Sequence, residues 1–228
     1  MTGLAPVELV LLLAWGIVVA LDLVSGPQAL LARPLVAGTV AGLLAGDLQA
    51  GLRVGVLLEC FALDVLPIGA ARYPDYGPAT VAAVAATAGR SHLDAIGPAM
   101  VLALLLAVTG GWSLQWLRHA NARAVQRRAA ALAAGQVRAI AWLQWEGLGR
   151  DAARGAALTA LGLVGAQLLR HVDVPASMAR GLHLAAVGGA LAAVAGGAVR
   201  GAGGAPAHRR WLAAGFGVGA VASLGLLQ

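Results

Sequence analysis

The sequence predicts an all-α polytopic membrane protein: a helical bundle with broken or re-entrant helices and one interfacial amphipathic helix. Hydrophobic residues make up 60% of the 228-residue chain and charged residues only 11%, whereas a soluble domain carries about a quarter charged residues. Several apolar runs are long enough to cross a bilayer as helices, and the short alternating segments typical of barrel strands do not occur in the sequence. We therefore expect residues 1–228 to form a single membrane-embedded domain.

Charge and motif content narrow the class further. The formal net charge is +6 and the basic residues are clustered, which in a membrane protein marks cytoplasmic loops, so we expect no nucleic-acid partner. The single cysteine, Cys60, excludes an internal disulfide and a cysteine-based metal cluster. Walker, dinucleotide-binding and zinc-protease motifs are missing from the sequence, so no cofactor and no metal site is predicted.

The first apolar segment, residues 7–24, is long enough to span a bilayer. It opens with Glu8 and lacks a basic n-region, so it is not a cleavable signal peptide. Asp22, close to its end, is interpreted as a charge at the membrane interface. The sequence Ser25-Gly26-Pro27 then predicts the end of this helix.

The next run is interrupted, and residues 34–46 are too short to span alone. Glycines recur there at every fourth position and share one helix face suited to close packing; they are Gly38, Gly42 and Gly46. A second helix is expected over residues 50–66. Asp47, between the two segments, either caps this second helix or pairs with Arg53.

Glu59 lies in an apolar run, and a buried carboxylate there must be paired, protonated or solvated by a cavity. Asp64 is five residues further, about 140° around a helix, so the two carboxylates need not share a face. Pro67 is expected to end or kink this helix. Residues 68–79 are rich in Pro and Gly and predict an unwound segment, which at membrane depth must be buried in protein or line a cavity.

The rest of the chain contains further apolar segments at residues 79–89, 95–114, 155–169, 181–199 and 211–227. Between two of them, residues 114–138 carry five arginines and no acidic residue: Arg118, Arg123, Arg127, Arg128 and Arg138. This pattern predicts a basic amphipathic helix lying on anionic lipid at the cytoplasmic face. The basic loop at 200–210 is separated from it by two spans, so both can be cytoplasmic.

Residues 33–78 carry an ordered set of short motifs: Arg33-Pro34-Leu35, Gly46-Asp47 followed by Gly51 and Gly55, Leu58-Glu59, Ile68-Gly69-Ala70-Ala71 and Pro74-Asp75. This set resembles the membrane component C (IIC) of the mannose/fructose/sorbose family of bacterial phosphotransferase sugar transporters. The resemblance covers about residues 20–90. Asp64 and Pro67 stand where mannose-type members commonly have Gly and a polar amide residue, so the sugar is left open.

The resemblance implies a non-enzymatic permease subunit in the bacterial inner membrane. The subunit would pair with a second membrane component, D (IID). Cytosolic components A and B (IIA and IIB) would carry a phosphohistidine relay. A hexose-like sugar would bind at the interface of the two membrane subunits and be phosphorylated as it reaches the cytoplasm.

Sugar hydroxyls are recognised by carboxylates, amides and aromatic platforms. In the resembling family, the connection after the first helix also carries a Gln shortly before Arg-Pro, which points to Gln28 here. The candidate sugar contacts are Gln28, Glu59, Asp64, Tyr73 and Asp75. For Asp75, the alternative is a structural ion pair with Arg72.

Two other functions fit the same residues. The carboxylates could serve as proton or ion sites of a secondary transporter or solute channel that is not coupled to phosphorylation. The chain could also be a non-transporting membrane scaffold that docks a partner through its basic helix. Uptake without the phosphorelay would indicate the first, and a Glu59→Gln variant that changes only stability would indicate the second.

Overall fold

The computed structural model describes residues 3–63, 65, 72–90, 95–203, 209–211 and 213–215. In these residues the secondary structure is helical, without strands, as predicted. The helices are α1 (Pro6–Val24), α2 (Pro34–Leu44), α3 (Leu48–Ala62), α4 (Tyr76–Thr87), α5 (Ile96–Arg127), α6 (Ala129–Ala133), α7 (Val137–His171) and α8 (Ala176–Gly201). Within the described part, α1, α5, α7 and α8 are long and apolar enough to cross a membrane.

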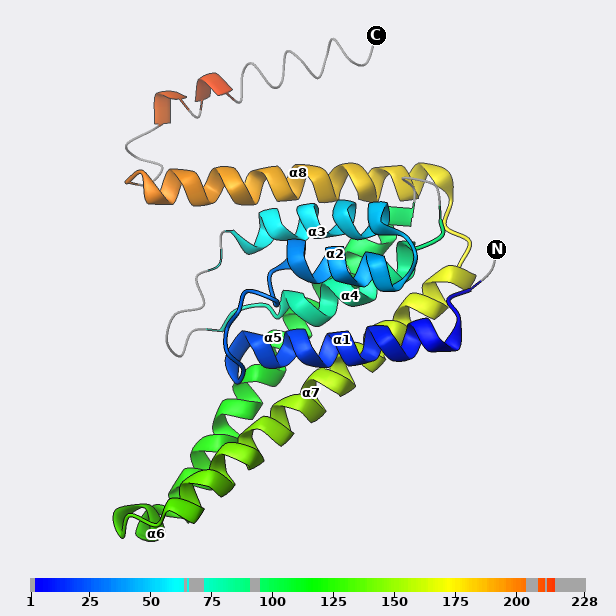
Figure 1. Cartoon of the computed structure of the whole chain (residues 1–228). Coiled ribbons are helices and arrows are strands. Elements are labelled where there is room, and N and C mark those ends of the chain that lie inside the picture. The colour runs from blue at the N-terminus through cyan, green and yellow to red at the C-terminus, as the bar shows by residue number, and fades with distance from the viewer. Residues whose placement is uncertain are drawn as a thin grey trace.

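Helix α4 forms the centre of the bundle. It contacts α1, α2, α3, α5 and α7, and every residue from Gly77 to Thr87 is buried. Its residues are mostly small, which lets neighbouring helices approach closely. Figure 1 shows α4 between α2 above and α1 below, with α8 along the top of the bundle next to α3.

The α2–α3 hairpin is packed glycine against glycine, which confirms the predicted role of Gly38 and Gly42. A Cβ at Gly51 of α3 would lie 2.3 Å from the Gly38 carbonyl oxygen and 2.8 Å from the Gly42 Cα. Gly51 and the facing Gly38 and Gly42 must therefore lack side chains. Gly46 has a different role, because it adopts a left-handed φ of +68° in the turn between the helices.

Asp47 caps α3, which decides between the two alternatives predicted for it. One carboxylate oxygen accepts the Ala50 N–H at 2.9 Å, and the other accepts the Gly89 N–H at 3.0 Å. The side chain thus ties the α2–α3 turn to the end of α4. At this same end, the guanidinium of Arg170 donates to the carbonyl oxygens of Ala85 and Ala88.

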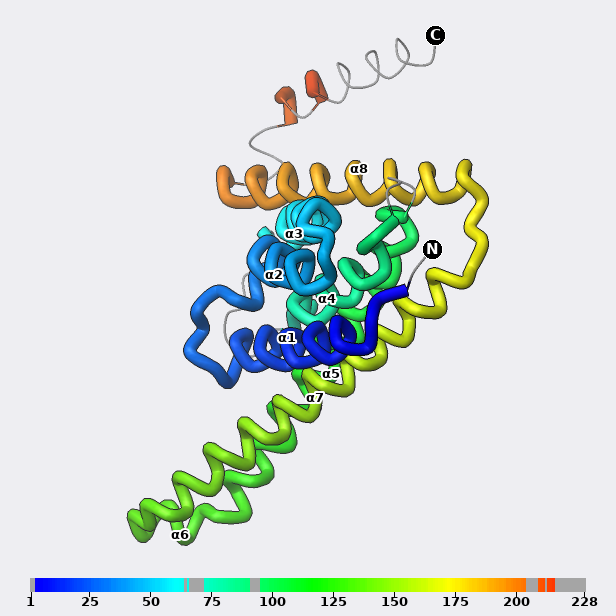
Figure 2. The backbone as a smooth tube through the Cα atoms, turned by 45° about the vertical axis from the view of Figure 1, so that its right-hand side comes forward, coloured from blue at the N-terminus to red at the C-terminus, as the bar shows by residue number. Residues whose placement is uncertain are grey.

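The sequence predicted a separate amphipathic helix over residues 114–138. This prediction is wrong for residues 114–127, which continue α5 without a break. Together with α6 and the first half of α7 they make a helical hairpin that projects beyond the bundle (Figures 1 and 2). We call residues 118–150 the arm. Its two helices are held together by polar contacts, because Arg150 donates to Asn121 at 3.0 Å and Glu146 pairs with both Arg128 and Arg150.

The predicted segments 155–169 and 181–199 correspond to the second half of α7 and to most of α8. The predicted segment 79–89 corresponds to α4. The segment predicted over 211–227 lies almost entirely outside the described residues, as do Asp64 and Pro67.

Candidate functional site

A cavity of about 570 Å³ opens where α1 ends, α2 begins, α3 ends and the extended segment 72–75 passes next to α5. Among the described residues, its polar lining comes from five different parts of the chain. These polar side chains are Asp22, Gln28, Arg33, Tyr73, Tyr76 and Arg118. The cavity therefore lies where helices are interrupted, which is where membrane transporters place their substrate sites.

The α1–α2 connection forms one wall of the cavity and has an unusual backbone. Gln28 and Leu30 have φ angles of +54° and +66°, a left-handed conformation that costs non-glycine residues about 1–3 kcal/mol each. Asp22, only 3% exposed, stabilises this connection. Its carboxylate accepts the N–H groups of Ala29 at 2.6 Å and Ala32 at 3.1 Å. Asp22 is thus a buried carboxylate that organises the connection, a role that its interpretation as an interfacial charge did not include.

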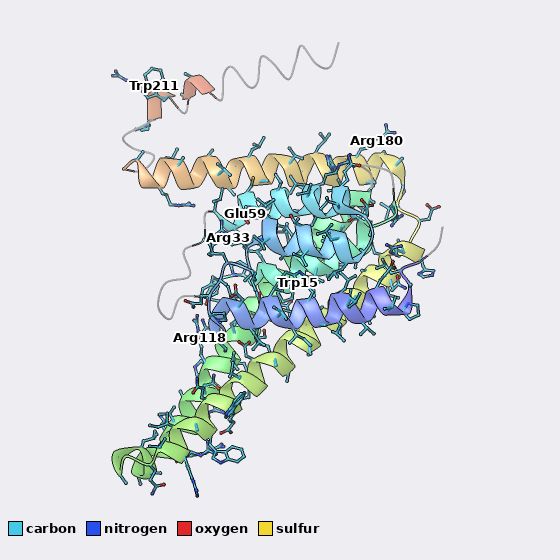
Figure 3. All side chains as sticks on the ribbon, viewed as in Figure 1. Trp15, Arg33, Glu59, Arg118, Arg180 and Trp211 are labelled. Carbon is cyan, nitrogen blue, oxygen red and sulfur yellow. The ribbon has the colours of Figure 1, made fainter. Side chains whose placement is uncertain are left out.

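Glu59, at the end of α3, is paired. It forms an ion pair with Arg33 and accepts the Leu35 N–H at 3.1 Å, so it fixes the start of α2 to α3. Figure 3 shows the two labelled side chains, Arg33 and Glu59, next to each other at one end of the bundle. Arg33 lines the cavity and Glu59 does not. Glu59 therefore acts on the cavity only by holding the Arg33 guanidinium in place.

Tyr73 forms part of the opposite wall. Its side chain is 7% exposed, and the Arg118 guanidinium lies over its ring, 5.1 Å from the centroid. This is the geometry of a cation–π contact. The extended segment passes very close to α5, since a Cβ at Gly111 would lie 2.5 Å from the Tyr73 carbonyl oxygen. The glycine is therefore needed to seat Tyr73.

Asp75 does not reach the cavity. Its side chain is fully buried, and one oxygen accepts from Nη1 of Arg154 on α7 at 2.7 Å. Its N–H donates to the Ala107 carbonyl oxygen at 2.9 Å. The predicted alternative, an ion pair between Asp75 and Arg72, was therefore wrong. The Arg72 guanidinium instead lies over the Trp112 ring, 5.8 Å from its centroid.

Of the five candidate sugar contacts, the structure brings Gln28 and Tyr73 together in one cavity. Glu59 acts from behind Arg33, Asp75 lies in the bundle interior, and Asp64 lies outside the described residues. Sequence reasoning missed Asp22, Arg33 and Arg118 as lining residues. It also missed the buried pair of Asp151 and Arg154, although two ionisable residues of opposite charge three positions apart on a helix are a usable signal.

The interrupted helices and the polar cavity among them define a multi-pass helical membrane protein. A family model described as the sorbose-specific IIC component of the phosphotransferase system (PTS) matches residues 6–226. The chain therefore belongs to this family, which confirms the resemblance seen in the sequence.

Individual relatives match over shorter stretches. The PTS system sorbose-specific EIIC component of Klebsiella pneumoniae is 41% identical over 71 residues, 31% of this chain and 26% of that protein. The PTS system mannose-specific EIIC component of Escherichia coli (strain K12) is 37% identical over 79 residues, 34% of this chain and 29% of that protein. The matched segments thus span less than a third of these curated relatives.

Two solved structures share the fold over nearly the whole chain. One, described as the structure of a membrane protein, has a TM-score of 0.74 and 23% identity, covering 98% of this chain and 92% of that chain. The other is a cryo-EM structure of the mannose transporter ManYZ in complex with microcin E492. Its TM-score is 0.63 at 23% identity, covering 99% of this chain and 93% of that chain.

Proposed function

We propose that this chain is the sugar-translocating membrane subunit of a phosphoenolpyruvate-dependent phosphotransferase system, and that the cavity next to the α1–α2 connection binds the sugar. The observation that carries this proposal is the lining of that cavity. It combines an amide from Gln28, the ring of Tyr73 and the guanidinium groups of Arg33 and Arg118. Groups of this kind bind the hydroxyls and the apolar face of a hexose-like sugar.

The residues have distinct roles in this proposal. Gln28 donates to and accepts from sugar hydroxyls, because its amide carries both kinds of group. Tyr73 supplies an aromatic surface, kept in place by Arg118. Glu59 orients the Arg33 guanidinium, and Asp75 holds the wall segment from behind. Asp64 remains a proposed sugar contact on the family resemblance alone.

The proposed partners follow from the family. A second membrane subunit, component D (IID), completes the sugar site, and the fold that this chain shares with the mannose transporter ManYZ supports such a pairing. Components A and B (IIA and IIB) supply the phosphoryl-transfer chemistry, so this chain works without a cofactor of its own. All of residues 1–228 form one permease domain in the bacterial inner membrane.

The arm is proposed to lie on the cytoplasmic side. It carries arginines along both of its helices and two largely exposed tryptophans, Trp142 and Trp145, near its end, and the exposed Trp116 lies on α5 just before it. Arginine clusters favour the cytoplasmic side and anionic lipid, and tryptophans favour the membrane interface. Anionic lipid and component B (IIB) are its proposed contacts.

The test is uptake of labelled mannose and sorbose by bacteria lacking their own transporters for these sugars. The chain is expressed with or without components A, B and D. Uptake that requires all partners and yields sugar phosphate is expected. Uptake that needs no phosphorelay and stops when the proton gradient is collapsed would instead identify a secondary transporter.

A further inference from the structure

Three ionisable side chains that do not line the cavity are buried at the base of the arm. They are Asp75, at the start of α4, and Asp151 and Arg154 on α7. The two carboxylates are fully buried and the Arg154 side chain is 4% exposed. Burial of such groups is costly unless they are paired and hydrogen-bonded, and a helix bundle of this kind could be closed with apolar residues instead. Their presence calls for a role other than packing.

These side chains connect α7 to one wall of the cavity through Ser25. The Ser25 hydroxyl donates to Asp151 Oδ2 at 2.6 Å. Ser25 directly follows α1 and begins the strained connection that contains Gln28. Asp151 in turn accepts from Arg154 Nε at 2.8 Å. The hydrogen bond from Ser25 therefore ties the start of the α1–α2 connection to α7, next to the close packing of α1 on α7.

The same side chains connect α7 to the other wall. Arg154 Nη1 donates to Asp75 Oδ2 at 2.7 Å and to the Ser113 hydroxyl of α5 at 3.3 Å. Asp75 lies two residues after Tyr73, in the segment that α5 clamps through its glycines. A Cβ at Gly110 would lie 2.6 Å from the Asp75 Cβ, so this segment is held from two sides.

We infer that Asp151 and Arg154 are positioning residues that fix the two polar walls of the cavity, Gln28 on one side and Tyr73 on the other, at one separation. Their side-chain hydrogen bonds reach the two walls through Ser25 and Asp75, which flank lining residues of the cavity. Since α7 is also one of the two helices of the arm, a displacement of the arm by a partner is transmitted to both walls. The consequence for sugar affinity rests on the proposed function, but the consequence for the wall separation does not.

The wall separation is measured directly with two spin labels and no sugar. The labels are attached to cysteines at exposed positions on the two walls, Ala29→Cys and Arg72→Cys, with Cys60→Ser. Asp151→Asn and Arg154→Lys are expected to shift and broaden the label-to-label distance distribution. Distributions unchanged in both variants would overturn the inference, whatever the sugar does.

A matched control comes from the same helix. Arg170 is a partly buried arginine on α7 as well, but it donates to the backbone carbonyl oxygens of Ala85 and Ala88 and so holds the far end of α4. Arg170→Lys should lower thermal stability and leave the distance distribution unchanged. If it alters the distribution as much as Arg154→Lys does, the effect is general loosening and the positioning role is wrong.

A mild variant keeps the test decisive if the charge variants fail to insert. Ser25→Ala removes only the hydroxyl that joins the α1–α2 connection to Asp151. Because the acceptor of this hydrogen bond is charged, its loss is expected to raise the Kd for mannose or sorbose about tenfold or more and to broaden the distance distribution. An unchanged distribution in Ser25→Ala would overturn the inference. If the Ser25→Ala distribution is broadened but the wild-type protein binds neither sugar, the positioning role stands and the proposed function is contradicted.

Discussion

The carboxylate of Asp22 should hold the α1–α2 connection in the conformation that presents Gln28 to the cavity. Two left-handed residues in this connection, Gln28 and Leu30, cost about 1–3 kcal/mol each. The two backbone N–H groups bound by Asp22 return about 1.5–3 kcal/mol each, because the acceptor is charged. The two contributions nearly cancel, so loss of one hydrogen bond is enough to release the connection.

Asp22→Asn is the perturbation that follows from this balance. Asparagine is nearly isosteric but keeps only one acceptor oxygen, and its amide nitrogen meets an N–H group that also donates. We expect a loss of about 1–3 kcal/mol of stability and a clear loss of sugar affinity. Thermal unfolding of the purified protein and equilibrium binding of mannose and sorbose measure the two effects separately.

Asp47→Asn provides the matched control. Asp47 likewise accepts two backbone N–H groups, but it lies at the far end of α2, about 15 Å from the cavity at 1.5 Å per helical residue. It should reduce stability to a similar degree and leave sugar affinity intact. Replacing Leu30 by Gly in the Asp22→Asn protein should restore part of the stability, because glycine adopts a positive φ without strain. Equal sugar affinity in wild type and Asp22→Asn would refute the role given to Asp22.

Three further substitutions test other parts of the structure. Glu59→Gln removes the ion pair with Arg33 and should abolish uptake while the protein still inserts; normal uptake at normal expression would remove Glu59 from the site. Gly51→Val adds a side chain where a Cβ would already lie 2.3 Å from the Gly38 carbonyl oxygen; overpacking costs about 1–3 kcal/mol, so an unchanged unfolding temperature would contradict the observed α2–α3 contact. Neutralising three arginines of the arm should weaken binding to vesicles containing anionic lipid, most strongly at low salt, and binding that ignores both the charges and the salt would exclude this contact. The three are Arg123, Arg127 and Arg128.

Local patterns in the sequence were sufficient for most of the fold. Hydropathy and helix-breaking residues predicted α1, α4 and the two helical segments of α2 and α3, because these features depend on neighbouring residues. The four-residue spacing of Gly38 and Gly42 likewise predicted a close contact with another helix. The continuation of α5 into the arm was not predicted, because the arginines after Trp116 suggested a change of environment, and only the pairing with α7 shows that the helix runs on.

The site was predicted only in part, because residues that contact one another there are far apart along the chain. Gln28 and Tyr73 came from residue chemistry and the family resemblance, and both line the cavity. The partner of Asp75 could not be predicted, since Arg154 lies 79 residues away on another helix. The structural role of Asp22 was not predicted, because its hydrogen bonds go to backbone N–H groups, which carry no signal in the side-chain sequence.

The most direct test of the whole account is sugar binding by the chain purified together with component D. Titration calorimetry with mannose and with sorbose is expected to show binding of at least one of them. Gln28→Ala and Tyr73→Ala should each reduce this affinity tenfold or more, which corresponds to about 1.4 kcal/mol. Leu13→Ala, in the apolar groove between α1 and α7, should bind as the wild type does. Wild-type affinity in both cavity variants, or loss of binding in the groove variant alone, would contradict the assignment of this cavity as the sugar site.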